Sequence, residues 1–540
     1  MQLNEYGLKH EKEQWEAAGY QIPQYDHEAM VSRTMETPYW LHFGSGNIFR
    51  AFQTNVVEGL LNRGELDRGI IAVGGSEAME KLFHPHDNYT VLVTLKVDGT
   101  IDKTIIGSVA EALTTDAGYS EHFDRLKEIF TKDSLQMVSF TITEKGYSLV
   151  GNDGEYTDAV KADFENGPEA PVSYMGKIAA FLYARYKVGA TPISMVSMDN
   201  CSHNGDVLHD AVAAYAEKWF ANGLVEEGFV SYINVPEKVA FPWSMIDKIT
   251  PRPDKSVEEL LKKDNIDGLE PIKTKRNTFI APFVNAEESQ YLVIEDLFPN
   301  GRPALDKGGI IFTDRETVEK VERMKVCTCL NPLHTVLAIF GCLMGYEKIC
   351  DEMKDPTLRK LVEGIGYKEG LPVVTDPGVI NPKEFIDNVI NVRLANPFKP
   401  DTPQRIVTDT SQKLAIRFGE TIKAYRDSDE LDVADLKLIP LVFAGWARYL
   451  TGVYDNGEPM DRSSDPILPL TGTREEGLKP EEAADIEGML RPMLSDEEAF
   501  GVNLYEVGMA DQVVKYFKEM ITHKGAVRDT LDKYVNEIMG

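Results

Sequence analysis

The chain has little cysteine and a deficit of basic residues. Its 540 residues include five Cys with no C-x-x-C pair: Cys201, Cys327, Cys329, Cys342 and Cys350. So sparse and odd a set argues against a disulfide framework or a cysteine-built zinc site. It favours buried free thiols in a reducing, cytoplasmic compartment.

Lys and Arg number 57 against 87 Asp and Glu, a net charge of −30. Such a surface repels phosphate backbones, so we expect no nucleic-acid partner.

Long apolar runs and internal repeats are also missing. Apolar stretches such as Val336 to Tyr346 fall short of the ~20 residues of a membrane span, and the N-terminus is polar and charged. We therefore expect no membrane partner. Apolar residues make up 43% and charged residues 27%, which is ordinary for a globular protein. The length suits about two to four domains.

The first half alternates strand and helix patterns. An apolar run at residues 39–43 is broken by Gly44-Ser45-Gly46, after which apolar residues recur at helical spacing from Phe49 to Leu60. Further strands are expected at 70–73, 137–143 and 193–198, with a hairpin strand at 89–97 and a helix at 174–186. This alternation predicts an α/β fold with a doubly wound, Rossmann-type parallel sheet. Its ligands are expected beyond the carboxyl ends of the strands.

The second half changes character. After residues 299–303, long helical patterns dominate, for example at 318–346, 409–425 and 510–539. We place a domain boundary near residue 300. The sequence thus predicts an α/β domain over residues 1–300 and a mainly α-helical domain over residues 301–540.

The glycine turn between the first strand and helix is a candidate phosphate loop. Gly44 and Gly46 would let the backbone approach a pyrophosphate, and Asn47 and Ile48 would present N–H groups at the start of the helix. The third glycine of the usual pattern is replaced by Phe49. A tight strand-to-helix connection with no ligand is the alternative. After the next strand, Glu77 is a candidate acceptor for the hydroxyls of a ribose, although a solvated surface Glu explains it equally well.

A candidate catalytic site lies in the second half of the chain. An otherwise apolar helical segment there contains Lys325, Asn331 and His334. A Lys among apolar neighbours loses solvation of its charged form, which favours proton exchange near neutral pH. An Asn amide can donate to a carbonyl oxygen on which negative charge develops. The alternative assigns no chemistry: Lys325 reaches water, Asn331 caps a helix and His334 is a core histidine.

Six motifs in this order resemble the mannitol dehydrogenase family of polyol-specific long-chain dehydrogenases, over roughly residues 38 to 425. They are HFGSGNIFRAF from His42, TITEKGY from Thr141, Asp199-Asn200, MIDKITP from Met245, the Lys325/Asn331/His334 set, and the polar pattern from Asn396 to Lys413. The resemblance implies a zinc-independent, nicotinamide-dependent oxidoreductase. Its N-terminal Rossmann-type domain would bind the dinucleotide, its helical domain would bind substrate, and the active site would lie between the two.

The resemblance also implies roles for single residues. Lys325 matches the general acid/base of the family, and Asn200 and Asn331 match the amides that polarise the reacting oxygen. The residues matching groups that hold the substrate are His334, Asp247, Arg405 and Lys413. NAD is expected over NADP because Glu77 would repel a 2′-phosphate and no Arg follows the Gly74-Gly75 turn.

One departure concerns the spacing of the catalytic set. Lys325 and Asn331 are six positions apart, one more than in the family pattern. On a regular helix the extra residue would rotate Lys325 by about 100° away from Asn331. We expect either that Lys325 precedes the helix or that a π-type bulge absorbs the extra residue. The remaining alternative is that Lys325 is not the acid.

The substrate class is a sugar acid or a polyol. Arg393, Lys399, Arg405 and Lys413 form a cationic cluster in a strongly acidic chain, which suits a sugar carboxylate. Residues of this kind also hold the hydroxyls of polyols. We favour reduction of fructuronate to mannonate with NADH, with tagaturonate and mannitol as alternative substrates. A catalytically silent sugar- or nucleotide-binding protein is the alternative of another class.

Overall fold

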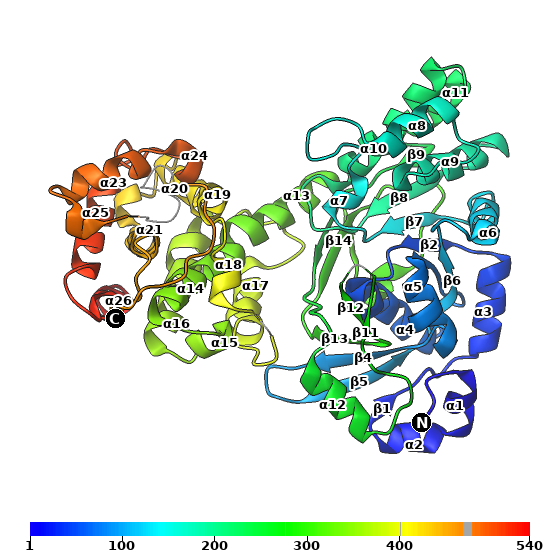
Figure 1. Ribbon diagram of the computed structural model, residues 1–540, viewed down its shortest axis with the longest axis horizontal. Helices are drawn as coiled ribbons and strands as arrows, with labels where there is room; N and C mark the ends of the chain where they lie inside the picture. The colour runs from blue at the N-terminus through cyan, green and yellow to red at the C-terminus, as the bar shows by residue number, and fades with distance from the viewer. Residues whose placement is uncertain (276, 400, 468–477) are drawn as a thin grey trace. The chain divides into compact units, whose positions relative to one another are not determined.

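Figure 1 shows the computed structural model, which describes residues 1–275, 277–399, 401–467 and 478–540. The chain divides into two compact units. Unit 1 contains Met1–Leu95 and Thr100–Glu319, and unit 2 contains Lys96–Gly99 and Lys320–Gly540. The boundary was expected near residue 300, whereas this division falls inside helix α13 (Arg315–Arg323). A continuous helix carries no Gly or Pro signal that would mark a division in the sequence.

Unit 1 is built on a six-stranded sheet in the order β6-β3-β2-β7-β8-β9, in which every pair of neighbours is parallel. Counted along the chain within this sheet, the order is 3-2-1-4-5-6, which confirms the predicted Rossmann-type fold. The strands are β2 (Trp40–Phe43), β3 (Ile70–Gly74), β6 (Val109–Thr114), β7 (Met137–Phe140), β8 (Ile193–Ser197) and β9 (Val239–Ala240).

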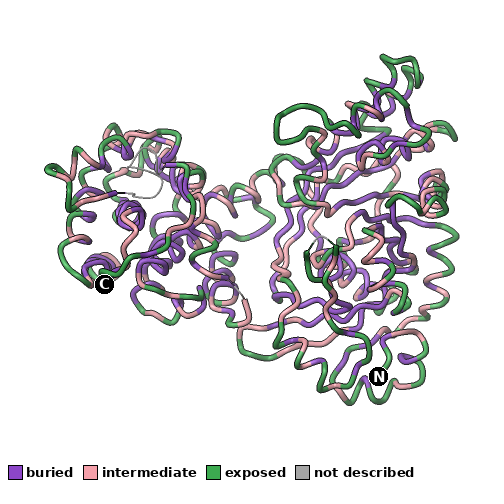
Figure 2. Tube along the Cα trace, in the orientation of Figure 1, coloured by how far each residue is buried: buried purple, intermediate pink, exposed green. Residues whose placement is uncertain are grey.

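Two apolar cores cover the two faces of this sheet. The central strands β2, β7 and β8 are buried along their whole length, as the apolar runs in the sequence predict (Figure 2). One core contains Phe43 and Phe181, and the other contains Trp40 and Phe52. The helices of unit 1, apart from α13, are α1 (Glu5–His10), α2 (Lys12–Ala17), α3 (His27–Glu36), α4 (Thr54–Asn62), α5 (Ser76–Ala78), α6 (Ser120–Phe130), α7 (Glu144–Tyr147), α8 (Asp158–Asn166), α9 (Tyr174–Lys187), α10 (Asn204–Ala221), α11 (Glu227–Asn234) and α12 (Lys255–Lys263).

Three smaller sheets complete unit 1, and most of their strands were not predicted. A four-stranded sheet has the order β1-β5-β4-β13, with β4 and β5 forming the expected antiparallel hairpin. Its strands are β1 (Tyr20–Gln21), β4 (Thr90–Leu95), β5 (Ile101–Ile106) and β13 (Phe283–Glu287). The others are β10-β14-β15 and the β11-β12 pair: β10 (Ser244–Asp247), β11 (Ile272–Lys273), β12 (Phe279–Ile280), β14 (Tyr291–Glu295) and β15 (Ile311–Thr313).

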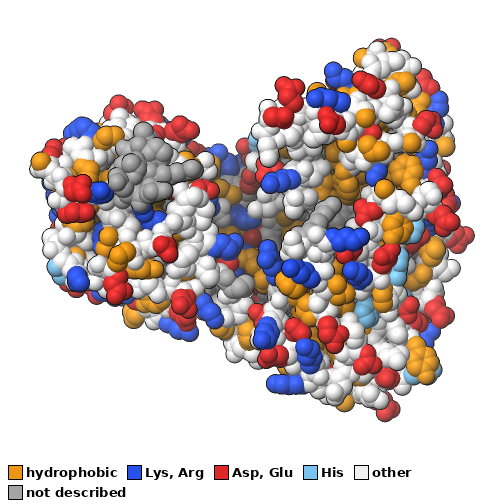
Figure 3. Space-filling model, in the orientation of Figure 1, with side chains coloured by type: hydrophobic (Ala, Val, Ile, Leu, Met, Phe, Trp, Pro, Cys, Tyr) orange, Lys and Arg blue, Asp and Glu red, His pale blue; other side chains and the backbone are white. Residues whose placement is uncertain are grey.

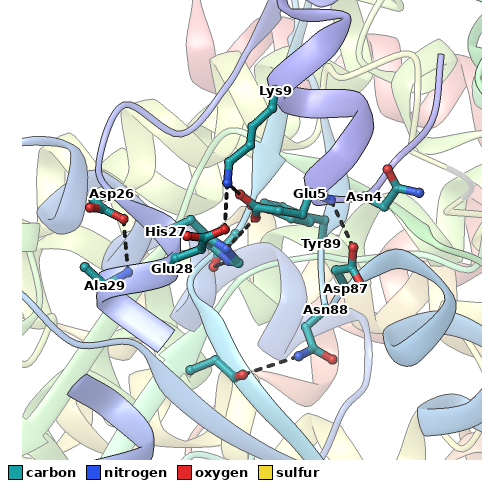
Figure 4. Close-up of polar contacts among 12 residues, drawn as sticks. Asn4, Glu5, Lys9, Asp26, His27, Glu28, Ala29, Asp87, Asn88 and Tyr89 are labelled. Carbon is teal, nitrogen blue, oxygen red and sulfur yellow. Dashed lines mark hydrogen bonds and ion pairs between the residues drawn. The ribbon is translucent and has the colours of Figure 1, made fainter. Parts of the chain in front are cut away.

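A polar cluster ties the N-terminal helices to this hairpin sheet (Figure 4). The Glu5 carboxylate of α1 accepts from the Tyr89 hydroxyl at 2.7 Å and lies 2.8 Å from Nδ1 of His27. The Lys9 ammonium lies 3.0 Å from Glu5 and 2.8 Å from Glu28 of α3. The first 37 residues therefore form part of the packed α/β unit, a contribution that the sequence did not reveal.

Unit 2 is helical, as predicted, and its core contains the fully buried helix α21 (Leu438–Tyr449), which packs against α14 (Asn331–Met344) and α25 (Ala510–Met520). The stretch expected as one helix at 510–539 is two, α25 and α26 (Ala526–Met539), separated at Gly525 with φ +90°. The others are α15 (Ile349–Glu352), α16 (Pro356–Glu363), α17 (Pro382–Asn388), α18 (Pro403–Ile406), α19 (Ser411–Leu414), α20 (Glu420–Arg426), α23 (Ile486–Leu494) and α24 (Glu497–Phe500).

One helical run, Arg315–Met344, is long and apolar enough in composition to cross a membrane, which the lengths of the apolar stretches had not suggested. Of its most apolar window, 78% is buried inside the protein, as in a core helix.

Acidic side chains are spread over the outer surface of both units in the view of Figure 3, in keeping with the net charge of −30.

Candidate active site

A cavity of about 580 Å³ lies at the carboxyl ends of the parallel strands in unit 1. Residues that end or follow β2, β3, β6 and β7 line it, including the point where the strand order reverses. They are Gly44, Ser45, Val73, Gly74, Gly75, Thr115, Asp116, Thr141, Ile142 and Lys145, and Tyr174 adds an aromatic wall from α9. The cavity therefore occupies the place where a sheet of this order binds a dinucleotide.

Two glycines keep the backbone open toward this cavity. Gly44 has φ +122°, and a Cβ there would lie 2.2 Å from the carbonyl oxygen of Thr141. A Cβ on Gly74 would lie 2.0 Å from the Ser45 hydroxyl. Neither position accepts a side chain without movement of its neighbours. At Gly46, in contrast, a Cβ would meet nothing within 4 Å.

Of the five residues predicted to bind the cofactor, Gly44 lines the cavity. Gly46, Asn47 and Ile48 follow it and lead into a π-helical turn, η1 (Phe49–Gln53), that continues as α4. The Asn47 amide donates to the carbonyl oxygen of Pro251 at 2.9 Å, which gives this side chain a structural partner. The cofactor roles of these three residues stay predictions.

The fifth predicted residue, Glu77, is held by protein groups. Its carboxylate accepts from the backbone N–H of Lys275 at 3.0 Å and lies 3.1 Å from the ammonium of Lys81. Asp116, at the end of β6, is the carboxylate that lines the cavity, and it accepts from the backbone N–H of Ser76 at 2.7 Å. Asp116 was not among the predicted residues, because no strand was predicted at 109–114. The polar pair Thr115-Asp116 directly after β6 was the available signal.

The TITEKGY motif forms a turn followed by the short helix α7, and Asp199 anchors both. The Asp199 carboxylate accepts from the backbone N–H groups of Ile142 and Thr143, both at 2.9 Å, and from the Tyr147 hydroxyl at 2.6 Å. Thr143 has φ +65°, which is strained for a β-branched residue and is held by this carboxylate. Burial raises the pKa of Asp199. Helix α7 presents Lys145 to the cavity.

Unit 1 also contains two predicted substrate-side residues. Asn200 is exposed and follows β8, and Asp247 is buried at the end of β10. The two strands are joined by buried hydrogen bonds: the Ser244 hydroxyl donates to the carbonyl oxygen of Ser197 at 2.6 Å, and the Asn204 amide donates to that of Ser244 at 3.0 Å. The fold thus positions Asn200 and Asp247 from neighbouring, rigidly linked elements.

In unit 2, Lys325 lies in a π-helical turn, η5 (Met324–Cys329), between α13 and α14. The backbone N–H of Leu330 donates to the carbonyl oxygen of Lys325 at 3.1 Å, a bond over five residues that widens the turn. Asn331 then opens α14. The expectation that a π-type bulge absorbs the extra residue is therefore confirmed. Lys325 is buried, with 6% of its surface exposed.

His334, one turn into α14, faces a buried carboxylate. Its Nε2 atom lies 3.7 Å from an oxygen of Asp401, and among the described residues this buried nitrogen has no hydrogen-bond partner. Burial holds the pKa of His334 below its ordinary value, so the ring is neutral. A neutral imidazole with a free nitrogen is suited to bind a hydroxyl group.

The cations of the predicted cluster have different partners. Asp401 lies 3.7 Å from the ammonium of Lys399 and accepts a hydrogen bond from Arg405, whose side chain is 66% exposed. The Lys413 ammonium donates to the carbonyl oxygen of Thr408, and burial lowers its pKa. Arg393 is fully buried. Of the four, Arg405 is the cation most open to a ligand.

No group of three or more His, Cys, Asp or Glu side chains among the described residues is placed to hold a metal ion. All five cysteines are free thiols, and four of them are buried, as expected.

Comparison with known proteins agrees with this geometry. Residues 39–307 match the family described as the mannitol dehydrogenase Rossmann domain, and residues 317–521 match the mannitol dehydrogenase C-terminal domain. The chain is 51% identical over 539 residues to the D-mannonate oxidoreductase of Thermotoga maritima, which covers 99% of both chains.

Two solved structures resemble the whole chain. One is a D-sorbitol dehydrogenase in substrate-free form, with a TM-score of 0.77 at 26% identity over 95% of this chain and 98% of that one. The other is the mannitol 2-dehydrogenase of Pseudomonas fluorescens in a ternary complex with NAD and D-mannitol, with a TM-score of 0.68 at 26% identity over 99% of this chain and 100% of that one.

Proposed function

Since this chain belongs to the mannitol dehydrogenase family, we propose that it is a D-mannonate oxidoreductase, which interconverts fructuronate and mannonate with NAD. The observation that carries this proposal is the 51% identity, over 99% of both chains, to a protein of that name. The two polyol dehydrogenase structures are each 26% identical. The coarser statement, a nicotinamide-dependent oxidoreductase acting on a secondary alcohol, follows from the family.

The residues at the cavity of unit 1 fit NAD. Gly44 and Gly74 leave the backbone bare where a pyrophosphate approaches, and the cavity lies at the switch point of the sheet. Asp116 places a carboxylate at its wall, which accepts ribose hydroxyls and repels a 2′-phosphate. Asp116 thus supports the preference for NAD over NADP that was expected from Glu77.

The reaction requires one hydride and one proton to move. NAD, when bound, would supply the group that accepts or donates the hydride. In the reductive direction, Lys325 donates the proton to the oxygen of the ketone, while Asn200 and Asn331 donate amide hydrogens to that oxygen as it gains charge. His334 and Asp247 hold substrate hydroxyls. These roles rest on the family resemblance. The burial of Lys325 supports its proposed role as the proton donor.

The substrate is proposed to be a keto-hexuronate. Arg405 and Lys413 are the cations that would hold its carboxylate, and most of the Arg405 side chain is exposed. The catalysis is proposed to be independent of zinc because the proton is handled by an amine. The five free thiols support a reducing, cytoplasmic location.

The proposal is tested by following the absorbance of NADH with fructuronate, tagaturonate and fructose in separate reactions. We expect the highest kcat/KM with fructuronate. A preference for tagaturonate or fructose would reassign the substrate to the respective alternative. If NADH is not consumed with any of the three substrates, the protein is a catalytically silent binding protein.

The role of Lys325 is tested by Lys325→Ala. Loss of a general acid lowers turnover by roughly 10²- to 10⁴-fold, and we expect the affinity for NADH to be unchanged. Lys348→Ala, at an exposed lysine of the same unit, is the matched control and should retain full turnover. Full activity in Lys325→Ala would remove this residue from the mechanism.

A further inference from the structure

A chain of buried polar side chains crosses the Rossmann-type sheet and ends at the cofactor cavity. The indole Nε1 of Trp40 lies 2.6 Å from the Ser139 hydroxyl, which lies 2.6 Å from Nδ1 of His42. Nε2 of His42 lies 2.9 Å from the hydroxyl of Thr141, which lines the cavity. Trp40 and His42 are on β2, and His42 is opposite Ser139 of β7. The first three residues are at most 1% exposed.

The direction of every hydrogen bond in this chain follows from its first member. An indole N–H can only donate, so Ser139 accepts from Trp40. Among the described residues the Ser139 hydroxyl has one other partner, Nδ1 of His42, and its single hydrogen must point there. Nδ1 therefore accepts, and the proton of the ring is on Nε2.

The ring carries only that one proton. His42 is fully buried and stacks on Phe49 at 4.2 Å between ring centroids, and burial lowers its pKa to about 3. Nε2 therefore donates to the Thr141 hydroxyl oxygen, and the backbone of Gly44 is a further hydrogen-bond partner of the ring. With that lone pair engaged, the Thr141 hydrogen is directed away from His42.

We infer that Trp40, Ser139 and His42 form a one-way hydrogen-bond relay that fixes the Thr141 hydroxyl as a donor to an acceptor atom of the bound nicotinamide nucleotide. Thr141 is then a cofactor-binding residue, and the other three are positioning residues. The inference rests on the proposed cofactor. It explains why polar groups occupy these positions of two otherwise apolar, buried strands, where apolar residues would pack without any need for partners.

The experiment measures dissociation constants for NADH by fluorescence. Thr141→Val removes the donor and keeps the shape, so we expect roughly tenfold weaker binding, the worth of one hydrogen bond. Thr141→Ser keeps the hydroxyl and should bind within about twofold of wild type. Equal affinity of Thr141→Val and wild type would overturn the inference.

The relay is tested by a double-mutant cycle. Ser139→Ala frees Nδ1, so the imidazole proton can move there and the Thr141 hydroxyl turns to donate to Nε2. We expect a several-fold loss of NADH affinity in the wild-type background and none in the Thr141→Val background. A loss of equal size in both backgrounds would show a merely structural effect and overturn the relay.

Ser194→Ala is the matched control, since Ser194 is equally buried in neighbouring β8 and donates to the carbonyl oxygen of Leu297. It should lose stability without losing NADH affinity. If Ser139→Ala does not fold, the Thr141 pair decides the question because Thr141 is half-buried at the cavity wall. Absence of NADH binding to wild type would overturn both the proposed function and the relay, whereas normal wild-type binding with an unaffected Thr141→Val overturns the relay alone.

Discussion

Replacing Gly44 by Ala should destabilise unit 1 and abolish cofactor binding. At φ +122°, an L-residue is strained by roughly 1 to 3 kcal/mol. The added Cβ would lie 2.2 Å from the Thr141 carbonyl oxygen, and moving that backbone costs a further 1 to 3 kcal/mol, roughly as for overpacking. The sum, roughly 2 to 6 kcal/mol, is a large fraction of the stability of a typical domain.

The assay combines thermal unfolding with NADH titration. The midpoint temperature of thermal unfolding should be lower in Gly44→Ala than in wild type by roughly 5 to 20 °C, and added NADH should not restore the wild-type midpoint. Gly46→Ala is the matched control two residues away, where the new Cβ meets nothing. Its stability should change by less than about 1 kcal/mol, while NADH binding weakens if Gly46 contacts the cofactor as predicted. If Gly44→Ala has the unfolding midpoint and the NADH affinity of the wild-type protein, then Gly44 is not required in its strained conformation beside Thr141.

Two further predictions concern buried carboxylates. Burial raises the pKa of Glu58 from 4.5 to about 7, so its folded form resists ionisation and stability should fall as pH rises from about 4.5 to 7. Glu58→Gln should remove this fall, on the order of 3 kcal/mol, in a pH series of urea unfolding, and an unchanged pH profile would contradict the assignment. Asp401→Asn should cost about 3 to 5 kcal/mol by the same assay because Lys399 loses its buried counter-charge. Arg405→Gln, which removes the 66% exposed partner of the same carboxylate, should cost less than about 1 kcal/mol, and equal losses would show that burial does not set the effect.

The main sheet could be predicted from sequence because its strands are short apolar runs between turn signals. β2, β3 and β8 fall where the runs at 39–43, 70–73 and 193–198 place them. The strand order was not predicted from these runs; their alternation with helices predicted only a doubly wound parallel sheet, and the order comes from the structure. The short strands β11 and β12 and the N-terminal β1 carry too few residues for a period-2 pattern, so they were missed.

Residues of the candidate site could be predicted where the residue type itself suggests a role. They could not be predicted where the role depends on which residues are neighbours in the fold. Gly44 was found from the G-x-G pattern, but the same pattern gave equal weight to Gly46, and only the proximity of Thr141 separates them. Asp116 was missed because no strand was predicted at 109–114. The relay through His42 was missed because each member is unremarkable until the register of β2 and β7 brings them together.

The spacing of Lys325 and Asn331 shows why an irregular count can itself be informative. On a regular helix, one extra residue turns a side chain by about 100°, enough to remove it from the face that carries Asn331 and His334. The chain takes up that residue in the turn from Met324 to Cys329, where the carbonyl of Lys325 accepts from a donor five positions on. Five other π-helical turns occur among the described residues, so this turn accommodates the extra residue without assigning a role to Lys325, which stays a prediction.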